Sequence, residues 1–89
     1  MESGVIWKYP LVLADKQSLV LPKDAKFLHV AVQDGGTWLW ALVLPDNPTE
    51  ARFLRIIGTG NPVEYPNDPY IGTVHTASGF VWHIFEAWT

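Results

Sequence analysis

Glycine, proline, asparagine and aspartate divide this 89-residue sequence into short apolar runs. The runs between these residues are rich in Val, Ile, Trp and Phe, which favour β-strands, whereas the dividing residues are typical of turns. The pattern predicts an all-β domain of about seven short strands. A small antiparallel β-sandwich and a partly open barrel both fit this number of strands.

The expected strands cover residues 5–13, 17–21, 26–33, 37–44, 52–57, 70–76 and 80–88. Pro10 confines the first strand to a sheet edge or splits it, because proline has no N–H to donate. The Asp-Gly-Gly sequence at residues 34–36 predicts a hairpin turn between the third and fourth strands. Residues 49–52 are compatible with a single helical turn before the fifth strand.

The side-chain pattern of the two central hairpin strands predicts which faces are buried. In the third expected strand, Leu28, Val30 and Val32 alternate with other residues and should face the core. The fourth expected strand is apolar on both faces, so it should lie between two layers or under a subunit interface. Trp38 and Trp40 share one of its faces. Five tryptophans exceed what one small core can bury, which predicts a homo-oligomer.

Composition and charge exclude several classes of protein. With 48% hydrophobic and 17% charged residues the chain is not a disordered one, and without linkers or repeats it should form one domain over residues 1–89. The formal net charge is −3 and no lysine or arginine cluster exists, which argues against binding of duplex nucleic acid. No apolar run is long enough to span a membrane, and the first residues, Met-Glu-Ser-Gly, lack the charged and apolar regions of a signal peptide, so none is expected. A cytoplasmic protein is expected.

The residues that usually carry catalysis or bind metals are sparse. The three histidines, His29, His75 and His83, do not have the spacing of zinc ligands, and Cys and a Gly-x-Ser-x-Gly motif are absent. We therefore expect no enzyme activity, no metal and no cofactor. The enzymatic alternative requires that these histidines and Glu86 meet in the fold. Glu86 itself is more simply explained as a charged residue that protects an edge strand from aggregation.

The Gly-Thr-Gly-Asn-Pro sequence at residues 58–62 is the strongest candidate for a ligand-binding loop. Two glycines around a hydroxyl residue allow successive backbone amides to converge on an anion, and Arg55 lies three residues earlier to contact a phosphate. The alternative is a bulge and tight turn at the end of a strand. The loop is not a P-loop, because the Gly-Lys-Ser/Thr ending is missing.

If the ligand is a small nucleotide, the loop and Arg55 would hold its phosphate. A base would then stack on an aromatic side chain, and a histidine would contribute a hydrogen bond. The candidate ligand-binding residues are Trp40, Arg55, Gly58, Thr59, Gly60, Asn61, Tyr70, Trp82 and His83.

Five segments in a fixed order resemble a family of small uncharacterised proteins that are common in phage and prophage genomes. These segments are IWKY at residues 6–9, LWALV at 39–43, GTGNP at 58–62, YIGT at 70–73 and VWHIFE at 81–86. The resemblance implies no catalytic residues. It implies a phage-type accessory protein that acts in the bacterial host cytoplasm by stoichiometric binding, for example by sequestering a nucleotide immune signal as a homo-oligomer. The alternative is a protein–protein inhibitor of a host factor, or a structural accessory protein, with no small-molecule ligand.

Overall fold

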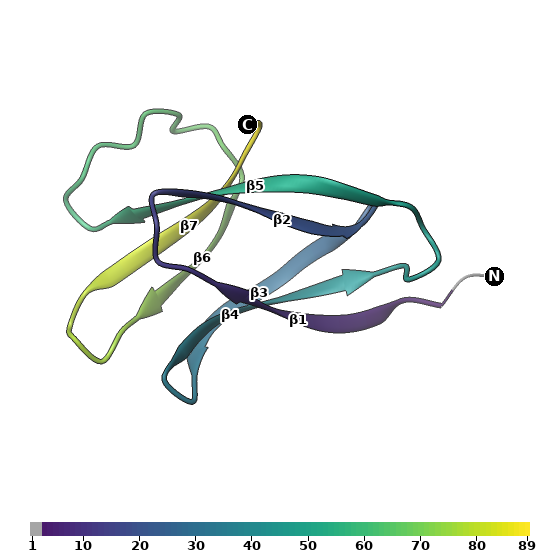
Figure 1. The fold of residues 1–89 in the computed structure, drawn as a ribbon. Helices are drawn as coiled ribbons and strands as arrows, with labels where there is room; N and C mark the ends of the chain where they lie inside the picture. The colour runs from purple at the N-terminus through teal and green to yellow at the C-terminus, as the bar shows by residue number, and fades with distance from the viewer. Residues whose placement is uncertain (1–2) are drawn as a thin grey trace.

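The computed structural model describes residues 3–89 and contains seven β-strands (Figure 1). Their bounds are β1 (Val5–Leu11), β2 (Lys16–Pro22), β3 (Lys26–Gln33), β4 (Gly36–Val43), β5 (Thr49–Gly58), β6 (Tyr70–His75) and β7 (Val81–Ala87). Within residues 3–89 there is no helix long and apolar enough to cross a membrane.

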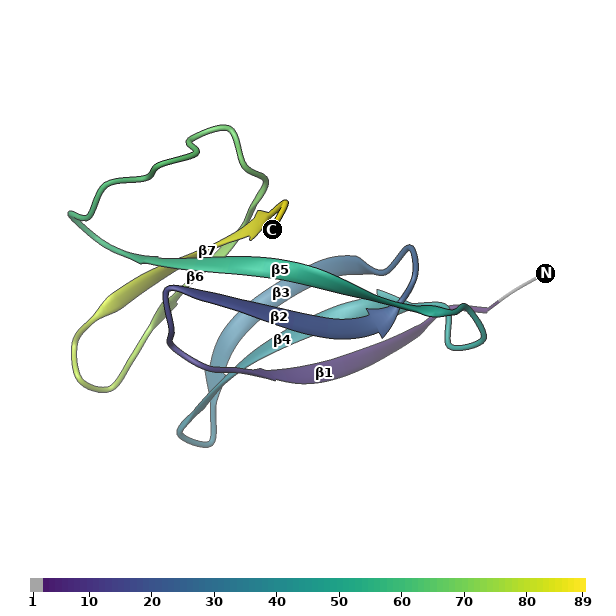
Figure 2. The same cartoon turned by 45° about the horizontal axis from the view of Figure 1, so that its top comes forward.

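The strands form two antiparallel sheets that lie face to face (Figure 2). Sheet A has the order β1-β4-β3, and sheet B has the order β2-β5-β7-β6. This confirms the expected all-β fold and its sandwich form, with no closed barrel among the described residues. Strand β1, which contains Pro10, lies at an edge of sheet A, as the missing proline N–H requires.

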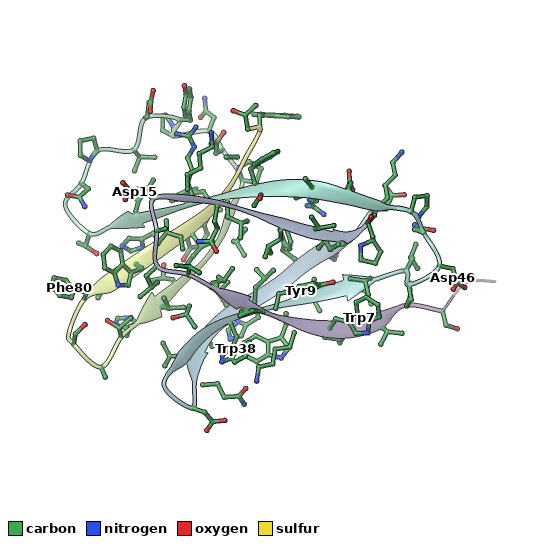
Figure 3. All side chains as sticks on the ribbon, in the orientation of Figure 1. Trp7, Tyr9, Asp15, Trp38, Asp46 and Phe80 are labelled. Atoms are coloured by element: carbon green, nitrogen blue, oxygen red, sulfur yellow. The ribbon has the colours of Figure 1, made fainter. Side chains whose placement is uncertain are left out.

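The hydrophobic core fills the space between the two sheets. Its buried side chains come from the strands and, in the case of Ala25, from the connection before β3. They form two clusters, Leu11, Val30, Leu39, Leu54, Ile56, Val74 and Ile84 in one, and Leu21, Ala25, Ala41 and Val43 in the other. Tyr9, Leu19 and Phe27 are partly buried and pack against both clusters. Figure 3 shows Tyr9 pointing into this space and Trp38 lying on the other side of sheet A. Shared packing therefore makes the two clusters one continuous core.

Strand β5 is longer than the sequence pattern predicted. It begins at Thr49, which pairs with Pro22 of β2, so the expected helical turn over residues 49–52 is wrong. Hydrogen bonds to β2 satisfy the backbone N–H and C=O groups of residues 49–52. These bonds outweigh the weak helical preference of the local sequence. The first and last strands are shorter than expected, because they end at Leu11 and Ala87.

A β-bulge changes the burial pattern of β3. The register with β4 shifts between Phe27 and His29, so Leu28 is the extra residue and has no partner in the ladder. Val30 is only 2% exposed, as expected, but Leu28 is 41% exposed, and the expectation that it faces the core is wrong. Val32 lies on the same inward face as Val30, opposite the buried Thr37, as expected, but it is 39% exposed because it lies near the hairpin end of the strand.

Within residues 3–89, none of the five tryptophans is fully buried. Trp38 and Trp40 share the outer face of β4, as predicted, and both are half-buried, as is Trp82 on β7. Trp7 is 41% exposed, and Trp88, beyond the end of β7, is 89% exposed. Trp82 packs against the hydrophobic core, whereas the other four tryptophans lie at the surface of the sandwich.

Glu86 lies on β7, which has β5 and β6 on its two sides, so its assignment to an edge strand is wrong. It shares a face with the buried Leu54, and its carboxylate accepts hydrogen bonds of 2.7 and 2.8 Å from Nε and Nη2 of Arg52 on β5. Arg52 Nη1 also donates to the carbonyl of Ala25, immediately before β3. The pair is structural, and it connects sheet B to the chain that enters sheet A.

Candidate functional site

A long loop on the outer side of sheet B forms the principal groove of the molecule. This loop, residues 59–69, leaves β5 and returns to β6 on the side away from sheet A (Figures 1 and 2, green). Together with β5 and β7 it lines a groove of about 370 Å³, a size typical of small-molecule sites. Side chains on the wall include those of Arg55, Asn61, Tyr65, Trp82 and Phe85.

Local sequence explains why the loop holds an open arch. Three prolines, Pro62, Pro66 and Pro69, oppose helix formation over this stretch. The amide of Asp68 donates to the carbonyl of Tyr65 at 3.0 Å, which closes a turn. At the return, the amide of Glu86 donates to the carbonyl of Pro69 at 2.8 Å. The arch is therefore anchored to β7 before β6 begins.

Arg55 is the central polar residue of the groove. It lies on the outer face of β5, paired with Phe85 of β7, and its guanidinium is 4.5 Å from the centre of the Tyr65 ring. Its Nη1 atom is 3.6 Å from a carboxylate oxygen of Glu64, whose side chain is 72% exposed. The Nε atom of Arg55 is buried and has no hydrogen-bond partner among the described residues. Arg55 is therefore only loosely paired, and the exposed part of its side chain, 22% of the total, is what a ligand in the groove can contact.

The Gly-Thr-Gly-Asn segment at residues 58–61 forms a tight turn. The amide of Asn61 donates to the carbonyl of Gly58 at 3.1 Å, and the amide of Thr59 donates to the carbonyl of Val81 at 3.2 Å. Gly60 has a φ of +90°, which glycine adopts without strain. Because two of these amides already have partners, the segment does not present a series of free amides to an anion. The structure shows the turn alternative.

Gly58 allows two groove residues to approach the backbone closely. A Cβ atom at this position would lie 3.1 Å from Nδ2 of Asn61 and 3.2 Å from Cζ3 of Trp82. Both distances are shorter than ordinary van der Waals contact. The absence of a side chain at Gly58 therefore brings Asn61 and Trp82 together at one end of the groove.

The groove combines one cation with several carboxylates. Of the residues that line it in the described part of the chain, Arg55 is the one with a permanent positive charge, and Asp15, Glu64 and Asp68 are acidic. Carboxylates accept hydrogen bonds from hydroxyl and amino groups, and a guanidinium binds phosphate or carboxylate. The groove is thus suited to a ligand with one anionic group and several neutral donors.

A chain of hydroxyl groups holds His83 beside the groove. Nε2 of His83 is 2.8 Å from the hydroxyl of Thr59, and Nδ1 is 2.9 Å from the hydroxyl of Thr73. Thr73 in turn contacts the hydroxyl of Tyr70. A neutral imidazole donates from one nitrogen and accepts at the other, so both threonines satisfy it and fix its ring. The chain joins the loop, β6 and β7.

The structure gathers eight of the nine predicted residues at this end of sheet B. Those that line the groove are Arg55, Gly58, Asn61 and Trp82. Those in the adjacent hydroxyl–imidazole chain are Thr59, Tyr70 and His83, and Gly60 is exposed at the turn between them. Trp40 does not belong to the site: it lies on the outer face of sheet A.

Sequence reasoning missed several residues of the site. They are Asp15, Glu64, Tyr65, Asp68 and Phe85 in the groove and Thr73 in the chain. Most of them lie on the loop or on the outer faces of the strands that border it. The irregular, proline-rich stretch over residues 62–69 was the available signal, because long structureless loops in small domains are often functional.

The structure does not assemble the enzymatic alternative. His29 lies on the outer face of sheet A, where its ring is 5.9 Å from that of Trp40. His83 lies on the outer face of sheet B, and Glu86 is bound to Arg52 on the other face of that sheet. His75 is exposed at the end of β6. Among residues 3–89, no group of three or more His, Cys, Asp or Glu side chains is arranged to hold a metal ion.

Comparison with known proteins identifies the family and nothing beyond it. Residues 3–89 match the Domain of unknown function (DUF7352). Neither a curated protein nor a solved structure matches the chain. The resemblance to an uncharacterised domain family is confirmed at this level. The match covers all the residues that form the sandwich and the groove, and the chain therefore belongs to the DUF7352 family of domains of unknown function.

Proposed function

We propose that this protein is a phage-type accessory protein that binds a small nucleotide stoichiometrically in the groove of sheet B. One observation carries the proposal. The groove brings Arg55, aromatic rings and carboxylates from three separate parts of the chain around a volume suited to a small ligand. These three kinds of group match the phosphate, the base and the hydroxyl and amino groups of a nucleotide.

Arg55 binds the phosphate in this proposal. Glu64 forms an ion pair with Arg55, but Nη1 of Arg55 and Oε2 of Glu64 are 3.6 Å apart and the Glu64 side chain is largely exposed. Exposed ion pairs of this kind contribute only about 0.2–1 kcal/mol, so a phosphate can displace the carboxylate at low cost. The Arg55 side chain is 22% exposed, so the exposed part of its guanidinium, and not the buried Nε, would contact the phosphate.

The base and sugar occupy the remaining walls. Tyr65 and Phe85 offer aromatic surface, which stacks on bases without strong sequence preference, and Trp82, which packs against the core, borders the groove. Asp15 and Asp68 accept hydrogen bonds from sugar hydroxyls or from an exocyclic amino group. The hydroxyl–imidazole chain of His83 keeps the adjoining end of the groove rigid.

The biological setting of the proposal rests on the phage-type resemblance. In that setting the protein acts in the bacterial cytoplasm and sequesters a nucleotide immune signal of the host. A homo-oligomer is part of the proposal, because several large apolar side chains stand free on the surface. The most exposed are Val12 at 68%, Val20 at 65%, Phe80 at 62% and Trp88 at 89%. Light scattering of the purified protein measures this oligomeric state directly.

Isothermal titration with a panel of linear and cyclic nucleotides tests the proposed ligand. We expect one nucleotide to bind, and Arg55→Ala to weaken its binding by about tenfold or more, since charged hydrogen bonds contribute about 1.5–3 kcal/mol. Glu64→Gln should tighten binding a few-fold, because it removes both a competitor for Arg55 and a negative charge. Lys26→Ala, which removes one positive charge from the other sheet, is the matched control and should have little effect.

Two results would contradict the proposal. The first is a folded wild-type protein that binds none of the nucleotides. The second is a nucleotide that binds equally well to the wild type, to Arg55→Ala and to Glu64→Gln, because its phosphate then lies elsewhere.

A further inference from the structure

The outer face of sheet A, on the opposite side of the sandwich from the groove, forms a separate surface. The ladder between β1 and β4 places Ile6, Lys8 and Pro10 opposite Leu42, Trp40 and Trp38. The residues that alternate with these on β4, Leu39, Ala41 and Val43, are fully buried in the core. Leu42, Trp40 and Trp38 therefore point away from sheet B. Figure 3 shows Trp38 on that side of the sheet. From β3, Lys26 and His29 pair with Leu42 and Trp40 and complete what we call the Trp38–Trp40 face.

The charge of the Trp38–Trp40 face is opposite to that of the whole chain. The strands β1, β3 and β4 contain no aspartate or glutamate, yet this face carries Lys8, Lys26 and His29. The whole chain has nine acidic and six basic residues, which gives a formal net charge of −3. The basic face is therefore complementary in charge to an acidic partner, although the protein as a whole is acidic.

Lys8 is held in place over the aromatic rings. Its Nζ atom lies 4.0 Å from the centre of the Trp38 ring and 5.8 Å from that of Trp40, and it donates a hydrogen bond to the side chain of Gln33 on β3. Around it, Ile6 is 58% exposed and Leu42 is 38% exposed. The face thus combines two tryptophans, a lysine held over them and exposed aliphatic side chains. Such a combination is typical of a protein-binding hot spot.

Two other occupants fit this surface less well. A second copy docked face to face would bring four lysines, Lys8 and Lys26 from each copy, into one interface to which these strands contribute no carboxylate, and like charges at an interface are unfavourable. Single-stranded nucleic acid gains most of its affinity from neutralised phosphates, and this face offers only two lysines next to bare aliphatic groups. We infer that the Trp38–Trp40 face docks a protein that presents carboxylates around an apolar patch.

Fluorescence anisotropy with labelled peptides tests this inference on the full chain. The probe is a short peptide of alternating Glu and Leu, compared with one of alternating Lys and Leu and with oligothymidylate. We expect the Glu-Leu peptide to bind most tightly and Lys8→Glu/Lys26→Glu to weaken it by about tenfold or more. Lys16→Glu/Lys23→Glu makes the same change of charge on and next to β2, and it should have a much smaller effect.

Amide chemical shifts then locate the bound peptide. We expect the largest changes on β1, β3 and β4, and their loss in a folded Trp40→Ala variant. No binding of the Glu-Leu peptide, tighter binding of the Lys-Leu peptide or of oligothymidylate, or shifts confined to sheet B would overturn the inference. If Trp40→Ala instead dissociates a homo-oligomer, the face belongs to a second copy and the inference is likewise overturned. Nucleotide binding in the groove is measured separately, so either proposal can fail alone.

Discussion

Arg52→Ala is expected to lower the free energy of unfolding by about 2–3 kcal/mol, the largest effect we expect from a polar substitution in this protein. Arg52 binds both carboxylate oxygens of Glu86 and the carbonyl of Ala25, and its guanidinium lies 4.2 Å from the centre of the Phe27 ring. Hydrogen bonding to Glu86 raises the pKa of Arg52, so the arginine remains charged throughout the working pH range.

The size of this effect follows from partial burial. The side chains of Arg52 and Glu86 are 19% and 25% exposed. Removal of one partner from a fully buried pair costs about 3–5 kcal/mol, whereas an exposed pair contributes about 0.2–1 kcal/mol. The half-buried, bidentate pair falls between these limits, and the truncation also leaves Ala25 and Phe27 without their contacts.

Urea unfolding of the single variants Arg52→Ala and Glu86→Ala and of the double variant measures the interaction energy between Arg52 and Glu86. Glu86→Ala should cost about as much as Arg52→Ala, and Arg52→Ala/Glu86→Ala should cost clearly less than the sum of the two. Arg52→Lys keeps the charge but loses the bidentate contact, so it should lie between wild type and alanine. Additive losses below about 0.5 kcal/mol each would mean that the pair behaves as an ordinary surface contact.

Gly72→Ala is expected to destabilise the protein by about 1–3 kcal/mol through overpacking between the two sheets. A Cβ atom on Gly72 of β6 would lie 2.5 Å from Cγ2 of Val30 on β3. Val30 is 2% exposed and its branched side chain has few alternative rotamers, so it cannot simply turn away. Either β6 or β3 must shift.

Val30→Ala provides the control, because it removes the methyl group that the added Cβ atom would strike. Gly72→Ala should therefore cost much less in the Val30→Ala background than in the wild type, when both are measured by thermal or urea unfolding. Equal costs in the two backgrounds would show that Gly72 is required for some other reason than its contact with Val30.

Local sequence features were sufficient to predict most of the strands. Pro10 predicted an edge strand, and the Asp-Gly-Gly turn predicted the β3–β4 hairpin, because both depend on the backbone chemistry of a few adjacent residues. The β3 bulge could not be predicted in this way, since it depends on how that strand meets β4. It decides that Leu28 is exposed and that Phe27, opposite the buried Ala41, packs against the core instead.

The candidate site was predictable to the extent that its residues are neighbours along the chain or pair across adjacent strands. Arg55 and the turn at residues 58–61 lie together on one strand and the start of its loop. Trp40 was grouped with these residues although it lies on the other sheet, because an aromatic side chain suited to stacking carries no information about which sheet it belongs to. Glu64 and Tyr65 were missed because the way the loop folds back onto Arg55 depends on its anchor at Pro69.

The sequence by itself thus determined the all-β class, the approximate strands and the turn chemistry, because alternation, β-branching and backbone restrictions act over a few residues. Only the tertiary structure decided the strand order β2-β5-β7-β6, which brings segments far apart in the chain together. That order makes β7 a central strand, pairs Glu86 with Arg52, and places the groove and the Trp38–Trp40 face on opposite sides of the sandwich. These features depend on long-range packing, which no local pattern of residues specifies.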